Sequence, residues 1–141
     1  MSLSAKSLLL STLVLAGGGA LHGQRPLIVE SLSRTLGKGS YNNNATRPWV
    51  LTVRDGKAWI SDPMGAVDWR VGRTAPIPPE YASEDTWLEL DPRGALVLWE
   101  RVTNIYSGDW KNWERWRLTS PANGIKAIIF QDDGKLSFTL R

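Results

Sequence analysis

Three β-hairpin patterns, about 40 residues apart, constrain the fold of this chain more than any other feature of its sequence. Each pattern is a short apolar, β-branched run, a tight polar turn that contains glycine, and a second apolar run. The turn glycines Gly56, Gly94 and Gly134 lie 38 and 40 residues apart. The sequence therefore predicts hairpins over residues 48–61, 86–100 and 126–140.

Other similarities between these segments indicate a structural repeat. The tripeptide Asp-Gly-Lys occurs at residues 55–57 and again at 133–135. Tryptophan-containing segments, residues 65–70 and 111–117, follow the first two hairpins, and a polar stretch with proline follows each of them. A period near 40 with about four short strands per unit is typical of a propeller or a three-sheet prism. Three units are fewer than the 4–8 blades of a usual propeller, which favours the prism.

Eight tryptophans are a large number for a chain of 141 residues. Trp110, Trp113 and Trp116 are spaced three apart, as on a helix, but the turn residues before them favour a loop and a strand. We expect Trp69, Trp99 and Trp116 to lie in the core. Trp110 and Trp113 lie in a polar segment and are expected to be exposed, either as an aromatic platform for a ligand or as a cap on one end of the prism.

Residues 1–23 are typical of a secretory signal peptide. A basic head with Lys6 precedes an apolar run at residues 7–16 and a small-residue segment at 17–23. The apolar run is shorter than the roughly 20 residues that a spanning helix needs. We predict cleavage after Ala20 or Gly23, a secreted domain over residues 24–141, and no membrane attachment after cleavage; the alternative is an uncleaved N-terminal anchor.

Composition narrows the possible chemistry. The chain has no cysteine, and its one histidine, His22, would leave with the signal peptide. Ser-His and Cys-His nucleophile systems and the usual zinc sites are then excluded. A carboxylate pair such as Asp85 and Glu89 stays open in principle, although its spacing gives no support. No acidic cluster has the spacing of a calcium loop. We therefore expect no enzymatic activity, no metal and no cofactor.

Charge does not indicate a nucleic-acid partner. Loss of Lys6 leaves 16 Lys and Arg against 14 Asp and Glu, which is close to balance. The basic residues are not clustered beyond Arg115 and Arg117, on either side of Trp116.

The repeats resemble the bulb-type (monocot mannose-binding) lectin domain, whose units carry Gln-x-Asp-x-Asn-x-Val-x-Tyr. The motif often stands within the phrase Q-D-D-G-N-L-V-L-Y. Residues 131–139, QDDGKLSFT, begin as that phrase does, and residues 91–99, DPRGALVLW, end in a similar way. Residues 53–61 keep the Asp and Gly of the phrase. Residues 62–69, DPMGAVDW, are similar to the family's continuation. The likeness spans about residues 27–141.

This resemblance implies an all-β fold, a type II β-prism of three four-stranded antiparallel sheets with pseudo-threefold symmetry. Tryptophans would meet on its axis, with Trp69 and Trp116 at matching positions. The N-terminal strand, with Trp49 as a candidate member, would complete the third sheet. The resemblance allows a monomer or a homodimer.

The resemblance also implies a site for mannose-type glycans, because strand residues two apart share one face and can converge on a sugar ring. The third unit keeps Gln131 and Asp133 but has Lys135 and Thr139 where the family has Asn and Tyr. Lys135 cannot accept a hydrogen bond and could instead pair with Asp133. The first unit contributes Asp55 and Lys57. Alternatively, Asp55 and Asp133 only form the hairpin turns and do not contact a sugar.

Two functions follow. The first is a secreted carbohydrate-binding module, and the second is a secreted protein-interaction module that keeps the fold and has lost sugar binding. Asn44 begins the sequon Asn-Ala-Thr and is a candidate N-glycosylation site in an exposed loop.

Overall fold

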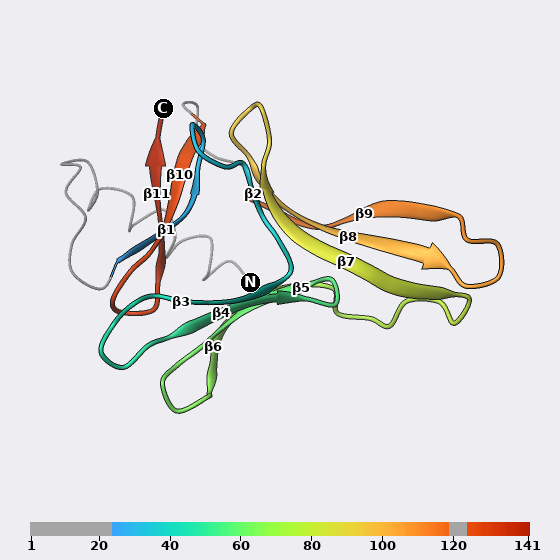
Figure 1. Cartoon of the computed structure of the whole chain (residues 1–141), viewed down its shortest axis with the longest axis horizontal. Coiled ribbons are helices and arrows are strands. Elements are labelled where there is room, and N and C mark those ends of the chain that lie inside the picture. Colours follow the sequence, from blue (N-terminus) through green and yellow to red (C-terminus); the bar gives the residue numbers. More distant parts are fainter. Residues whose placement is uncertain (1–23, 119–123) are drawn as a thin grey trace.

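The computed structural model describes residues 24–118 and 124–141, and this part of the chain is all-β, without a helix (Figure 1). The predicted signal peptide lies outside the described residues. Within them, no helix is long and apolar enough to cross a membrane. The strands are β1 (Arg25–Val29), β2 (Thr35–Leu36), β3 (Gly39–Asn42), β4 (Val50–Arg54), β5 (Lys57–Ser61), β6 (Val67–Gly72), β7 (Tyr81–Leu90), β8 (Leu96–Asn104), β9 (Trp110–Leu118), β10 (Ile125–Phe130) and β11 (Leu136–Leu140).

The strands form three antiparallel sheets, which Figure 1 shows as separate groups. Their strand orders are β3-β4-β5-β6, β2-β7-β8-β9 and β1-β10-β11. All three predicted hairpins are confirmed, as β4–β5, β7–β8 and β10–β11. Each hairpin lies in its own sheet.

The third sheet differs from the prediction, because within residues 24–118 and 124–141 it has three strands and not four. Only β1 joins the β10–β11 hairpin, through pairs such as Ile28 with Ile128. Trp49 does not take part in closing this sheet, since it lies directly before β4 in another sheet. The segment after β1 cannot supply the missing strand, because β2 and β3 each pair with one of the other two sheets.

The tryptophan segment at residues 110–118 is a strand, as the turn signals favoured. Leu98 pairs with Trp116 and Trp99 pairs with Glu114, so Arg115 is an extra residue at a β-bulge. The bulge places Trp113 and Trp116 on the same face of β9 although they are three residues apart. The bulge accounts for the shared face of these two tryptophans but not for Trp110, which lies on the opposite face.

Two copies of Asp-Gly-Lys occupy different kinds of turn. Asp55 and Gly56 have φ values of 54° and 72° and form a two-residue turn between paired Arg54 and Lys57. Positive φ at both central residues is typical of a type I′ hairpin turn. In the third hairpin only Gly134 has positive φ, and the wider turn is closed by a bond from Gln131 N to Lys135 O (2.9 Å). The tripeptide repeat is therefore not a structural repeat.

Each hairpin turn contacts a residue of another sheet's hairpin or the residues just before it. The backbone N–H of Gly56 donates to Thr86 Oγ1 (2.9 Å) on β7. Ile125, at the start of β10, donates its N–H to Gly94 O (2.9 Å). Gly134 lies against the ring of Trp49, before β4, and Asn43 Nδ2 donates to the turn at Gln131 O (2.8 Å). The three contacts connect the sheets in a closed cycle.

A single hydrophobic cluster joins the three sheets. It includes buried Leu51 and Ile60 from the first sheet, Leu98 from the second and Phe130 and Phe138 from the third. Trp69 is buried, which confirms its predicted core position. Trp116 is half-buried and packs against the core, edge to face on Trp69 with ring centroids 6.0 Å apart.

Trp99 is the exception to the predicted core. It is half-buried and lies directly opposite Trp87, whereas the neighbouring Leu98 and Glu100 are fully buried. Successive strand residues point to opposite faces, so Trp99 lies on the outer face of its sheet. The prediction for Trp99 was wrong because an apolar run of Leu96–Trp99 does not reveal which of its residues point inward.

The second sheet is longer than the others. β7 has 10 residues and β8 and β9 have 9 each, whereas β4, β5 and β11 have 5. The extra length projects as an arm, which extends to one side in Figure 1. The arm carries Trp110 at its distal end, opposite Thr103.

Candidate functional site

The predicted sugar residues of the third hairpin serve its turn. Asp133 Oδ1 accepts the backbone N–H of Lys135 (3.1 Å), and Gln131 is only 7% exposed. No ion pair between Asp133 and Lys135 is found among the described residues, so the predicted side-chain pairing is wrong; the carboxylate caps the backbone instead. Thr139 lies on β11, opposite Ala127 of β10.

The predicted sugar residues of the first hairpin lie elsewhere. The turn of the third hairpin packs at Trp49, before β4, whereas Asp55 and Lys57 follow the other end of β4. At about 3.3 Å per residue, the length of β4 separates the two groups. Asp55 O accepts both Arg73 Nη2 (2.7 Å) and Nε (3.1 Å). The structure therefore does not bring the six predicted sugar residues into one site.

Asn44 lies in an exposed position of the loop between β3 and β4, as its sequon requires. Its φ is 63°, and its N–H donates to Asn42 Oδ1 (2.9 Å). Glycosylation of Asn44 stays a prediction.

Trp110 and Trp113 do not form a pair. Trp110 is opposite Thr103, on the outer face of the sheet, and is 56% exposed. Trp113 is opposite the fully buried Glu100 and packs on Tyr81, with ring centroids 5.7 Å apart. The predicted platform is therefore divided between two faces, because both residues belong to one strand and not to an irregular segment.

A different set of aromatic residues does share one face. We call Trp87, Trp99 and Trp110 the tryptophan face; it covers the outer side of β7, β8 and β9. Trp87 and Trp99 are directly opposite each other, and the guanidinium of Arg101 lies over the rings of Trp110 (4.2 Å to the centroid) and Trp87 (5.9 Å). Arg101 thus connects Trp87 and Trp110 through cation–π contacts, and Trp99 lies beside them by cross-strand pairing with Trp87.

Hydrogen-bond acceptors surround the tryptophan face. Cross-strand pairing places Asp85 and Asn112 beside Arg101, and Glu114 beside Trp99. Asn112 Oδ1 accepts from Arg101 Nε (3.0 Å), and Glu89 Oε1 accepts from the indole of Trp87 (3.3 Å). The face therefore combines apolar ring surface with carboxylate and amide oxygens at its edge.

Sequence reasoning missed Trp87 and Arg101, although a signal was present. In a regular hairpin with Leu90 opposite Leu96, residue 87 must lie opposite residue 99. The turn at 91–95 alone was enough to pair the two tryptophans.

A groove lies between the edge strands β6 and β9. We call it the β6–β9 groove; it has a volume of about 680 Å³, and its wall includes Lys57, Arg70, Arg73, Arg115, Trp69 and Trp116. Behind it lies the carboxylate of Glu100, which is fully buried and accepts Arg115 Nε (2.8 Å) and pairs with Arg73 Nε (3.1 Å). The groove is therefore rich in cationic donors.

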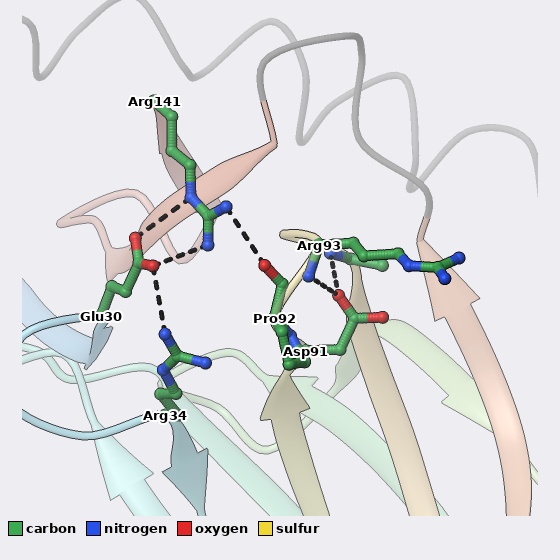
Figure 2. Close-up of polar contacts among 7 residues, drawn as sticks. Glu30, Arg34, Asp91, Pro92, Arg93 and Arg141 are labelled. Atoms are coloured by element: carbon green, nitrogen blue, oxygen red, sulfur yellow. Dashed lines mark hydrogen bonds and ion pairs between the residues drawn. The ribbon is translucent and has the colours of Figure 1, made fainter.

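A polar cluster connects the chain's last residue to the turn of the second hairpin (Figure 2). Arg141 donates to both carboxylate oxygens of Glu30, from Nη2 and from Nε, and its Nη1 donates to Pro92 O (3.2 Å). Arg34 pairs with the same carboxylate (3.3 Å). These contacts join β1, β11 and the β7–β8 turn, and their role is structural.

Asp91 organises the same turn. Its Oδ1 accepts the N–H groups of Arg93 and Ala95 (both 2.9 Å), and its Oδ2 pairs with Arg117 (3.3 Å). Burial raises the pKa of the carboxyl, but the two backbone N–H groups and Arg117 together outweigh burial and lower the pKa of Asp91 below its ordinary value of 3.8.

We expect Asp91 to make stability depend on acid pH. Because its pKa is lower in the folded chain, its contribution is complete above pH 3.8 and is lost as the pH falls through the folded-state pKa. Urea unfolding between pH 6 and pH 2 should show the wild type losing more stability than Asp91→Asn. Asp109→Asn, at an exposed position in the β8–β9 loop, is the control. Equal pH profiles for wild type and Asp91→Asn would contradict this role.

Among the described residues, no group of three or more His, Cys, Asp or Glu side chains is placed to hold a metal ion. Comparison of the chain with protein-family models, curated proteins and solved structures gives no match.

Proposed function

We propose that this chain is a secreted, non-catalytic carbohydrate-binding module, built as a β-prism of the bulb-type lectin kind. Three sheets around one core and the closed cycle of turn contacts support the prism. One sheet has three strands, so this prism departs from three four-stranded sheets.

The tryptophan face is the observation that carries the proposal. The C–H face of a sugar ring is apolar, so stacking it on an indole ring removes apolar surface from water and is favourable. The hydroxyls of the sugar then need hydrogen-bond acceptors around the indole. Trp110 is 56% exposed, and Asp85, Glu89, Asn112 and Glu114 provide acceptor oxygens around the face. Its ligand is a neutral glycan of the mannose type.

This site differs from the one that the sequence motif implies. In the third hairpin, Asp133 is engaged with the backbone of Lys135 and Gln131 is buried. On the tryptophan face, cation–π contacts hold the rings without covering Trp110 completely. We therefore assign glycan contact to β7, β8 and β9.

The test is binding of the mature chain to a panel of neutral glycans, followed by calorimetry on the best ligand. Trp110→Ala should weaken binding about tenfold, because truncating a central aromatic contact commonly costs more than 1 kcal/mol. Trp59→Ala is the matched control, because an arginine, Arg54, also lies over the ring of Trp59 (5.7 Å to the centroid), but on another sheet.

Asp133→Ala distinguishes the two sites. Its binding should equal that of the wild type. Loss of binding in Asp133→Ala with retention in Trp110→Ala would move the site to the third hairpin and contradict the assignment. A folded chain that binds no glycan on the panel would contradict the function itself.

Protein binding is the second candidate function, favoured by the loop between β8 and β9. Tyr106 is 83% exposed and Ile105 56% exposed, next to Trp110 at the distal end of the arm. Exposed apolar side chains gathered in this way are typical of protein contact sites.

A further inference from the structure

We propose that the β6–β9 groove is a second binding site, separate from the tryptophan face, and that its ligand is an acidic saccharide carrying carboxylate or sulfate groups. The two sites involve different side chains: the groove opens between two sheets, whereas the tryptophan face lies on the outer side of one sheet.

The charge of the groove indicates an anionic ligand. Lys57, Arg70, Arg73 and Arg115 line it, against a single carboxylate, Asp68. Lysine and arginine only donate hydrogen bonds, so the groove favours a ligand that mainly accepts them. Oxyanions meet this condition and form the stronger, charge-assisted bonds with guanidinium groups.

Two of the four cations are already fixed in position. Glu100 is fully buried, and its Oε1 holds Arg115 (2.8 Å) and Arg73 (3.1 Å). Arg73 is held a second time by Asp55 O, and the guanidinium of Arg115 lies over the ring of Trp113 (4.6 Å). Because these side chains are ordered without a ligand, binding loses less side-chain entropy.

The other two cations are available to a ligand. Arg70 is exposed and Lys57 half-buried, and neither has an ion-pair partner in the part of the chain that the structure describes. One carboxylate that holds two arginines leaves an excess of positive charge, to which Arg70 and Lys57 add. The groove therefore presents fixed and free cations side by side.

The size and walls of the groove indicate a saccharide and not a single inorganic ion. Its volume of about 680 Å³ lies within the range of sites for organic ligands, roughly 300–1,000 Å³. Trp69 and Trp116 contribute apolar wall between the cations. A sugar ring that bears an oxyanion has both an apolar face and a charged edge, which match this lining.

The experiment is calorimetric titration of the mature chain with four ligands. They are a sulfated hexasaccharide, its desulfated counterpart, an oligogalacturonate, and a single-stranded oligonucleotide with the same net charge as the sulfated hexasaccharide. We expect at least one of the two acidic saccharides to bind, with affinity that falls as salt rises. The desulfated sugar and the oligonucleotide should bind at least tenfold more weakly than that saccharide.

The variants separate this groove from general surface charge. Arg70→Gln with Lys57→Gln should weaken binding of the acidic saccharide at least tenfold, because each change removes a charge-assisted contact. Arg93→Gln removes one exposed arginine from the turn of the second hairpin and should leave binding within twofold. Trp110→Ala should also leave it unchanged, while it lowers binding of neutral glycans.

Four results would overturn the proposal: no binding of either acidic saccharide, equally tight binding of the oligonucleotide, equal losses in the groove and Arg93 variants, or loss of acidic-saccharide binding in Trp110→Ala. The proposed function is tested with neutral glycans, so each proposal can fail without the other.

Discussion

Glu100→Gln should destabilise the folded chain by about 3 kcal/mol, because it removes the charge that holds two arginines. Glu100 is fully buried on β8, and its Oε1 carries both Arg73 and Arg115. Its Oε2 has no partner among the described residues, so the two arginines are its main compensation for burial. Without the carboxylate, two largely buried guanidinium groups lose their counter-charge.

Urea unfolding at pH 7, followed by tryptophan fluorescence, measures this loss. Glu114→Gln is the control, since Glu114 pairs with Arg117 within β9 but is 41% exposed. Exposed pairs commonly contribute about 0–1 kcal/mol. Similar small losses in both variants would mean that the buried cluster does not join the first and second sheets as described.

Gly94→Ala should cost about 3 kcal/mol, far more than the same change at Gly65. Both glycines lie in the turn sequence Asp-Pro-x-Gly-Ala, and their φ values are +85° and +91°. Positive φ costs an alanine roughly 1–2 kcal/mol at either position. Only Gly94 is crowded: an added Cβ would lie 2.6 Å from Gly124 Cα and 2.6 Å from Ile125 N.

The contact at Gly94 is with backbone, which cannot rotate away, so overpacking adds roughly 1–3 kcal/mol. At Gly65 an added Cβ meets nothing within 4 Å. The difference between the two variants in chemical denaturation therefore measures how tightly the second hairpin turn is held against the third sheet. Equal losses would contradict the close turn contact.

The third hairpin explains why a match to the lectin motif does not by itself define a sugar site. In the third hairpin, the residues that most resemble the lectin motif are also the residues that make its turn: Asp133 caps Lys135, and the backbone of Gln131 closes the loop. Turn geometry and sugar contact use the same residue types. A sequence match alone therefore cannot distinguish between them.

The tryptophan face depends on pairing between strands. Trp110 was predicted to be exposed, but its neighbours Trp87, Trp99 and Arg101 come from two other strands. The error with Trp113 has a different origin, because Trp110 and Trp113 lie three residues apart on a regular stretch of β9 and therefore point to opposite faces. The bulge at Arg115 determines instead that Trp113 shares a face with Trp116.

The groove could not be predicted from sequence. Lys57, Arg70, Arg73 and Arg115 are distributed over almost 60 residues, in a chain whose Lys and Arg nearly balance its Asp and Glu. They meet because β6 and β9 are edge strands of adjacent sheets and Glu100 draws two of them together.

The sequence by itself determined the all-β class, the three hairpins and the tight turns, because alternating apolar residues and turn glycines act over a few neighbouring residues. It also predicted Trp69 in the core. Tertiary structure decided the number of strands in the third sheet, the outward position of Trp99, the tryptophan face and the cationic groove. Each of these depends on register, on a bulge or on contact between sheets, and such contacts join residues that are distant in the sequence.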